Sequence, residues 1–421
     1  MQIRTLETQN PEMLDTGYLK LNITNNENVP INNASISISL TGNPNSTLEK
    51  ITTNSSGASE NISLKAPPLE LSLDEANNIQ PYSEYTAYVT AEGYEPLDIS
   101  GIEIFSGQNA ILPVKLTPVS PKLFPGDIVI PAHTLFGYYP PKIAEDEIKP
   151  MNQSGEIVLS RVVVPETIIV HDGVPSDSSA PDYYVPYTDY IKNVASCEIY
   201  STWPEETITA NVLAIMSFTL NRVYTEWYRN KGYDFTITSS TAYDHKWIYG
   251  RNIFENISVI VDEIFDQFLS RPNVRQPILT QYCDGKRVTC PNWMSQWGSK
   301  YLGDIGYSPI EILRNYYGNS IYINSAEAIS GIPISWPGYD LTIGSRSEKI
   351  RQLQEQLNTI SDVYTIIPKL VADGIYGVRT ADAVREFQNI FGLPQTGVTD
   401  FKTWYKISQI YVGISRIAEL Q

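Results

Sequence analysis

The sequence predicts a multidomain α+β protein with three folded units, a β-sandwich followed by an α+β domain and a small helical domain. The chain has 421 residues, which is too long for one ordinary core. Its first part alternates apolar and polar residues as strands do, whereas later segments repeat apolar residues at helical spacing. All seven tryptophans lie at or beyond Trp203, which indicates that the two parts have different roles.

Composition restricts the partners. There are 47 acidic against 30 basic residues, a net charge of -17, which disfavours nucleic acid and anionic membrane surfaces as partners. No apolar run approaches the length of a membrane span. The first residues lack the charged-then-apolar layout of a secretory signal, so we expect no classical signal peptide. A neutral polymer or another protein is the favoured partner.

Residues 1–117 are expected to form the β-sandwich. Residues 18–23, 34–40 and 85–89 alternate in the manner of half-buried strands and are separated by Asn, Gly, Pro and Ser clusters. Short strands at this spacing predict an antiparallel sandwich. No cluster of potential ligands occurs here, so a structural role is expected. Residues 91–118 resemble the closing strands of carboxypeptidase-regulatory-like domains.

Residues 118–157 form a proline-rich segment. Prolines cannot join a sheet interior, and a run of them favours an extended chain. Residues 128–139 are too apolar for a bare linker, and we expect them to lie in a groove. Residues 142–155 are polar, which predicts a flexible tail that is open to proteolysis. The prolines in or beside this segment are Pro118, Pro121, Pro125, Pro131, Pro140, Pro141 and Pro150.

The middle domain, residues 158–324, contains the candidate catalytic acid Glu198. A strand-like run at 161–172 opens the domain, and Glu198 follows the weakly polar run 194–197. Trp203-Pro204 then signals a helix start. Partial burial against this helix favours the neutral carboxyl group, which is the form a general acid needs. The alternative is that Glu198 caps a helix or pairs with a basic residue.

Further helices are expected at about 253–269 and 308–317. Between them lie Cys283 and Cys290, and His245 is the only histidine in the domain interior. Zinc needs three or four ligands and no suitable third ligand lies nearby, so we expect no metal and no cofactor. The sequence leaves open whether the two cysteines form a disulfide.

Residues 325–338 form a Pro- and Gly-containing linker to a compact C-terminal domain at 339–421. Three apolar stripes at helical spacing predict a three-helix domain with glycine-marked turns. The stripes are Ile350, Leu353 and Leu357, then Ala383, Val384 and Phe387, then Phe401, Trp404 and Ile407.

This C-terminal domain resembles the peptidoglycan-binding repeat. Residues 373–388 carry the pattern D-G-x-Y-G-x-x-T-x-x-A-V-x-x-F-Q, and the resemblance covers about 339–414. Most of these residues are structural, glycines for turns and apolar residues for the core. The resemblance therefore implies a peptidoglycan-binding role that the residues alone do not demonstrate.

The middle domain resembles the catalytic domain of the SpoIID/LytB family of lytic transglycosylases. The shared segments are 185–198, Trp203-Pro204, 294–298 and 306–317. The resemblance implies that Glu198 is catalytic and that Ser295 and Gln296 bind substrate. Tyr243 and Trp297 are candidate stacking faces for sugars. Two features differ from the family pattern: Met216 stands where those proteins carry an arginine, and their zinc-binding histidine is missing.

The order of the domains is similar to that of SleC-type precursors of spore cortex-lytic enzymes. The resemblance implies a zymogen located at the spore cortex, cleaved by a subtilisin-like Csp protease, that acts on glycan strands of cortex peptidoglycan. A lytic transglycosylase needs only one carboxyl group, because the C6 hydroxyl of muramic acid replaces water. The alternatives are a non-catalytic peptidoglycan-binding scaffold, a hydrolytic muramidase using Glu198 with Asp244, and, most weakly, a zinc amidase.

Overall fold

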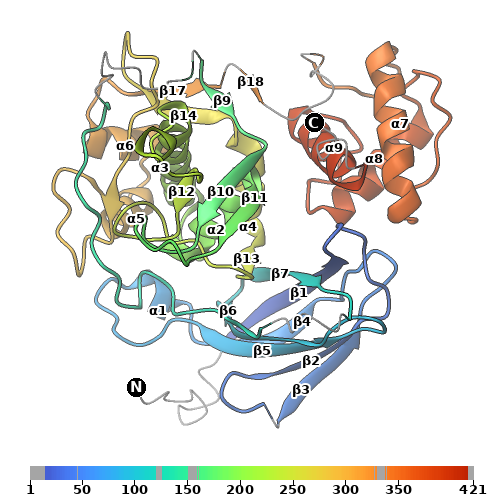
Figure 1. Cartoon of the computed structure of the whole chain (residues 1–421), viewed down its shortest axis with the longest axis horizontal. Coiled ribbons are helices and arrows are strands. Elements are labelled where there is room, and N and C mark those ends of the chain that lie inside the picture. Colours follow the sequence, from blue (N-terminus) through green and yellow to red (C-terminus); the bar gives the residue numbers. More distant parts are fainter. Residues whose placement is uncertain are drawn as a thin grey trace.

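The computed structural model describes residues 15–44, 46–119, 126–149, 159, 161–326, 328–329, 337 and 339–415. Figure 1 shows a β-sandwich below, a mixed α/β body above it, and a separate group of helices beside that body. This is the multidomain mixed α/β architecture that the sequence predicts. The expected cleavage region between 149 and 161 lies outside the described residues except for 159, and so does most of the 325–338 linker.

The N-terminal strands form two sheets that pack as a sandwich. Alternating burial along β1, with Leu19, Leu21 and Ile23 fully buried, shows which face forms the core. The prediction of an antiparallel sandwich is wrong for one pair, because β1 and β7 run parallel. The elements are β1 (Asp15–Asn25), β2 (Ser35–Leu40), β3 (Thr47–Thr52), β4 (Ile62–Ala66), α1 (Glu70–Leu73), β5 (Ser83–Thr90), β6 (Leu97–Ile104) and β7 (Asn109–Leu116).

Each sheet of the sandwich ends in a strand from outside residues 1–117. The strand order is β13-β7-β1-β4 in one sheet and β3-β2-β5-β6-β8 in the other. Strand β13 (Ile253–Phe254) belongs to the middle domain, and β8 (Ile128–Val129) belongs to the proline-rich segment. Buried apolar residues of the sandwich and the middle domain also form one continuous cluster. The two domains therefore share a core and a sheet.

A buried ion pair crosses the same interface. Arg251 donates from Nη1 and Nη2 to the two carboxylate oxygens of Glu103 at 3.1 and 2.6 Å, and both side chains are almost completely buried. Asn252 adds two hydrogen bonds to the backbone of Glu103. Such a pair has a large desolvation cost, so each charge depends on its partner.

The middle domain is built around helix α3 (Glu205–Tyr224), most of whose side chains are buried. The helix predicted at 253–269 is shorter than expected: α4 (Glu255–Ile264) ends five residues early, and β14 (Gln267–Ser270) follows as a strand paired with β17 (Tyr322–Ser325). The other elements are β9 (Val163–Val164), β10 (Thr167–His171), β11 (Asp182–Pro186), α2 (Tyr187–Glu198), the 3-10 helix η3 (Arg229–Lys231), β12 (Ile237–Thr238), α4 (Glu255–Ile264), β14 (Gln267–Ser270), β15 (Tyr282–Cys283), β16 (Met294–Ser295), α5 (Gln296–Asp304), α6 (Pro309–Tyr317), β17 (Tyr322–Ser325) and β18 (Ala328–Ile329).

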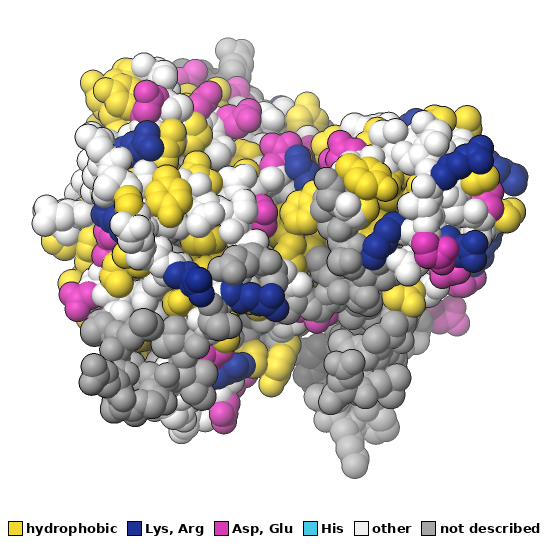
Figure 2. Space-filling model, turned by 90° about the horizontal axis from the view of Figure 1, so that it is seen from above, with side chains coloured by type: hydrophobic (Ala, Val, Ile, Leu, Met, Phe, Trp, Pro, Cys, Tyr) yellow, Lys and Arg dark blue, Asp and Glu magenta, His cyan; other side chains and the backbone are white. Residues whose placement is uncertain are grey.

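The C-terminal domain has the three predicted helices, α7 (Glu348–Val363), α8 (Val378–Ile390) and α9 (Phe401–Ser415), around their own core. It packs on the middle domain beside α4, where Phe401 stacks on Phe265 and Lys402 pairs with Glu263 at 2.7 Å. Among the described residues, no helix is both long and apolar enough to cross a membrane. On the face in Figure 2, basic and acidic side chains are interspersed.

The buried ion pair predicts a strong effect of removing one charge. Glu103→Gln leaves Arg251 buried without a counter-charge, and we expect it to lower the free energy of unfolding by about 3–5 kcal/mol. Urea unfolding of the full chain measures this. Glu60→Gln is the control, since Glu60 is exposed on the same domain. Equal unfolding midpoints for the two variants would contradict the assigned role of the pair.

Candidate active site

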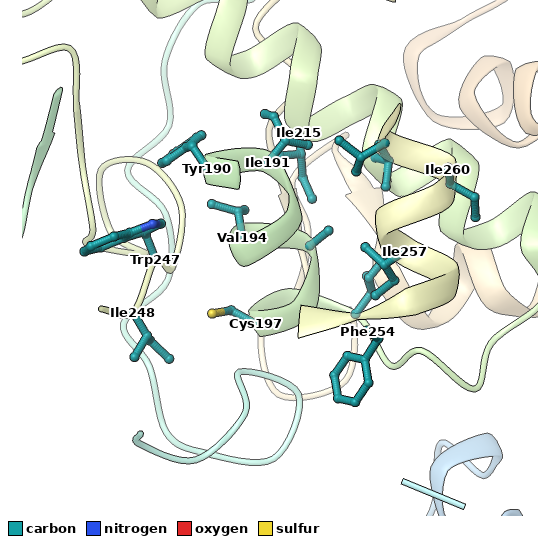
Figure 3. Packing of buried hydrophobic residues seen from close by; sticks show 14 of the residues in the cluster. Tyr190, Ile191, Val194, Cys197, Ile215, Trp247, Ile248, Phe254, Ile257 and Ile260 are labelled. Carbon is teal, nitrogen blue, oxygen red and sulfur yellow. The ribbon is translucent and has the colours of Figure 1, made fainter. Parts of the chain in front are cut away.

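Glu198 is the last residue of helix α2, and its side chain is enclosed. Only 3% of the residue is exposed. Oε1 accepts a hydrogen bond from the backbone N–H of Lys246 at 2.6 Å. Figure 3 shows α2 between two layers, with Trp247 and Ile248 on one side and Ile257 and Ile260 of α4 on the other. The acid is therefore held at the edge of a packed interior, as the sequence predicts.

The end of α2 is fixed by groups from three other segments. The last carbonyls of a helix lack partners within it and need outside donors. Here Arg251 donates to Ser196 O, the backbone N–H and hydroxyl of Thr134 both donate to Cys197 O, and Gln296 Nε2 donates to Glu198 O at 2.8 Å. The Nε2 atom of His133 lies 3.3 Å from Ile199 O. Two of these residues, His133 and Thr134, belong to the proline-rich segment.

Tyr282 and Lys142 lie close to the Glu198 carboxyl group. Burial, with the nearby Glu198, raises the pKa of the Tyr282 hydroxyl well above its usual value. Burial lowers the pKa of the Lys142 ammonium group, while the carboxylates of Glu198 and Asp244 oppose this shift. The Lys142 Nζ lies 4.6 Å from the centre of the Tyr282 ring and donates to Asp244 O. Lys142 thus places a cation near the candidate acid.

Residues 126–149, which we call the connector, lie along the middle domain. Ile130, His133 and Leu135 are buried, as expected for a stretch that lies in a groove, whereas Val129 and Tyr138 are exposed. Arg287 donates to the carbonyls of Leu135 and Gly137. The Lys246 Nζ lies 5.5 Å from the centre of the Tyr139 ring. The connector therefore passes over the segment that holds Glu198.

The prediction of a flexible polar tail is wrong for residues 142–149. These residues are bound to the middle domain by paired hydrogen bonds, such as Glu145 N to Gln281 Oε1 at 2.9 Å and Leu279 N to Glu147 O at 2.9 Å. Arg271 also binds both carboxylate oxygens of Glu147. Their polar side chains have specific partners, which composition alone does not reveal.

A buried charge cluster holds the connector beside the site. Arg222 of α3 donates through Nη1 and Nη2 to the Glu145 carboxylate at 3.0 and 2.6 Å, and through Nε to Asp244 at 2.7 Å. Lys149 completes the cluster with a 2.6 Å bond to Glu145. Burial lowers the pKa of Lys149 to about 8, against the attraction of Glu145. Two-point Arg–carboxylate bonding is among the strong contacts in proteins.

The other predicted site residues have mixed positions. Gln296 is buried and supports the backbone of Glu198, as described above. Ser295 caps helix α5 by accepting from Gly298 N at 2.9 Å, so its hydroxyl has a local structural role. Trp297 is 5% exposed and packs on Trp203, so it is a core residue in this structure and not the predicted stacking face. Tyr243 is half-buried in the turn before Asp244.

Cys283 and Cys290 form a disulfide, which answers the question that their spacing leaves open. The bridged loop carries Arg287 and joins β15 to β16, next to Gln296. His245 is buried and lies 3.1 Å from the Tyr190 hydroxyl. Among the described residues, no group of three or more His, Cys, Asp or Glu side chains is arranged to hold a metal ion.

Sequence reasoning missed Arg222, Arg251, Lys142 and the backbone N–H of Lys246. Met216, noted as a departure from the family pattern, is a buried core residue, and the buried guanidinium of α3 comes from Arg222 six positions later. A basic residue within an otherwise apolar helix was the available signal, because such a residue must have a buried partner. A backbone donor such as Lys246 leaves no comparable signal.

Comparison with known proteins identifies one part of the chain. Residues 346–407 match the model of the peptidoglycan binding domain family. The chain carries a peptidoglycan-binding domain. This supports a cell-wall-related protein and agrees with the predicted resemblance of the C-terminal helices. The match leaves the middle domain and the connector unassigned, and no curated protein matches the chain.

Solved structures with some likeness cover only about a quarter of the chain. They include the TIE protein of Bacillus anthracis at 19% identity, covering 25% of this chain and 17% of that one. GBS52, a minor pilin of Streptococcus agalactiae, has 14% identity over 27% and 49%. A mutant of catechol 1,2-dioxygenase from Acinetobacter radioresistens has 12% identity over 28% and 59%. All three have a TM-score of 0.18, which is too low to support an inference about function.

The contacts of Arg287 predict how the connector is held. Arg287→Ala removes two charge-assisted hydrogen bonds, and we expect amide exchange of residues 134–139 to speed up roughly tenfold or more. Hydrogen exchange of the full chain measures this, with helix α3 as an internal reference. Arg229→Ala, at a largely exposed side chain, is the control. Unchanged protection in the Arg287 variant would show that this arginine does not hold the connector.

Proposed function

We propose that the chain is the latent precursor of a peptidoglycan lytic transglycosylase in which Glu198 is both general acid and general base. The observation that carries the proposal is the enclosed Glu198 beneath the connector, with its carboxyl group bound by the Lys246 N–H and its backbone carbonyl bound by Gln296. The peptidoglycan-binding domain supplies the substrate class. The resemblance of the middle domain to the SpoIID/LytB family supplies the reaction.

The proposed reaction needs a single carboxyl group. Protonated Glu198 donates its proton to the glycosidic oxygen as the bond from that oxygen to C1 of muramic acid breaks. The resulting carboxylate then accepts the proton of the C6 hydroxyl, whose oxygen bonds to C1. The product has a 1,6-anhydro end, and Glu198 returns to its protonated form. Gln296 has a positioning role, because it bonds the backbone of Glu198.

The bonds of Asp244 disfavour the hydrolytic alternative. A muramidase would need a second carboxylate free to activate water or attack C1. Asp244 is fully buried; Oδ1 accepts from Arg222, and Oδ2 accepts from Tyr228, Thr238 N and Thr238 Oγ1 at 2.6 to 2.9 Å. Both carboxylate oxygens of Asp244 are therefore hydrogen-bonded within the protein and are not free to activate water. A scaffold without catalysis remains the second candidate, and it is favoured by Met216 at the position of the family's arginine.

The position of the connector supports the proposal of latency. Lys142 lies near Glu198 and Thr134 binds the end of α2, so a glycan strand must displace this part of the connector to reach the acid. A cut between about 149 and 161 breaks the covalent link between the connector and the middle domain. From the resemblance to SleC-type enzymes, we propose that a subtilisin-like Csp protease makes this cut at the spore cortex during germination.

The role of Glu198 predicts a specific loss of activity. Glu198→Gln keeps the shape of the side chain but removes the proton donor, so lytic activity of the cut chain should fall by about a hundredfold or more. Mass spectrometry of fragments released from purified cortex measures it. Glu205→Gln, in the exposed first turn of α3, is the matched control. Activity within a few-fold of the parent would remove Glu198 from the mechanism, and reducing ends in place of anhydro ends would indicate a hydrolase.

Latency is tested by comparing cut and uncut chains. A specific protease site placed within residues 150–158 allows the full chain to fold before it is cut. We expect the cut chain to release anhydro fragments and the uncut chain to be nearly inactive, because tethering holds the connector at an effective concentration of roughly millimolar. An intact chain, verified as uncut after the assay, that is as active as the cut chain would contradict autoinhibition.

A further inference from the structure

A group of aromatic side chains lies beside the candidate active site without a role in the proposed chemistry. Tyr183 of β11 stacks on Tyr249 with ring centres 4.7 Å apart and contacts Trp247 at 5.2 Å. Tyr249 is 44% exposed. Trp247 is mostly buried and contacts both tyrosine rings. Stacked rings of this kind offer a rigid apolar face with polar edges.

These rings line a cavity whose wall also includes Lys246, the residue whose backbone N–H binds Glu198. The cavity has a volume of about 480 Å³, and its middle-domain wall includes Asp172, Tyr183 and residues 246–249. Lys246 lines this cavity and also donates its backbone N–H to Glu198 Oε1. A ligand that continues from the acid along residues 246–249 therefore reaches the aromatic rings next.

The opposite wall of the cavity is made of connector residues 126–129 and Pro131. Ile128 packs directly on Gly250, where a Cβ atom would lie 2.8 Å from the Ile128 side chain. Strand β8 attaches this wall to the sandwich through β6. Separation of the connector would thus uncover the aromatic face over its length.

We propose that Tyr249, Tyr183 and Asp172 form a subsite for a sugar ring of the glycan strand. This ring lies next to the two sugars whose glycosidic bond is cleaved at Glu198. The inference rests on the proposed function. The strand extends to both sides of the cleaved bond, so a cleft for it must continue past Glu198. The tyrosine rings stack on the apolar face of a neutral sugar, and the Asp172 carboxylate accepts hydrogen bonds from its hydroxyl groups. The connector residues form the opposite wall, so we expect a strand to run from this subsite to Glu198 only after they have left.

The test measures binding without turnover. The full chain with Glu198→Gln and a protease site in 150–158 is cut, and titrated with soluble, peptide-free glycan strands by calorimetry; the uncut chain gives the contribution of the C-terminal domain. Tyr249→Ala should weaken the additional binding roughly five- to tenfold, while Tyr249→Trp, which keeps an aromatic face, should retain it. Tyr184→Ala is the matched control, because Tyr184 is 74% exposed and points to the other face of β11.

In the catalytically competent cut chain, Tyr249→Ala should raise KM for long strands with little change in kcat. Equal losses in the Tyr249→Ala and Tyr184→Ala variants, or no additional binding by the cut chain, would overturn the subsite. If the cut chain forms no anhydro ends but Tyr249→Ala still weakens its binding, the transglycosylase proposal fails and the subsite stands.

Discussion

The last carbonyl groups of helix α2 have no partners within the helix, and the need to bind them from outside is the constraint on which the rest of the site depends. A helix that ends in the interior must have its last carbonyls satisfied from outside. Arg251, Thr134 and Gln296 meet this need at Ser196, Cys197 and Glu198. Because these donors come from three separate segments, the position of the candidate acid is set by tertiary structure. The loop after β12 contributes the backbone N–H of Lys246 in the same way.

The same contacts tie the N-terminal sandwich to the site. Arg251 binds Glu103 of β6 and Ser196 of α2 with one guanidinium group. The connector is held at both ends, by β8 on the sandwich and by Glu145 on Arg222. Cutting the chain in 150–158 breaks none of these contacts. The proposed activation therefore needs two steps, the cut and the subsequent dissociation of the connector.

Elements with strong periodicity were predictable from the sequence, whereas long-range contacts were not. The strands near Leu21 and Ile36 and the helix after Pro204 follow from local pattern and proline placement. The parallel pairing of β1 with β7 joins residues about ninety positions apart, and no local pattern specifies it. The motif resemblance made Glu198 predictable as the candidate acid. The apolar helix that follows made its burial predictable. Polar tail residues such as Glu145 looked solvent-exposed because their partners lie far away in the sequence.

The charges around Arg222 explain how a polar segment can pack against the middle domain. With the connector bound, the guanidinium has two carboxylate partners, Asp244 and Glu145, and is fully buried. The lysine at position 149 balances the second carboxylate, so the cluster of two acids and two bases is neutral in sum. Loss of the connector removes one acid and one base together, and Arg222 keeps Asp244. Arg222 is thus left in a neutral pair with Asp244, so dissociation of the connector does not leave this guanidinium buried without a counter-charge.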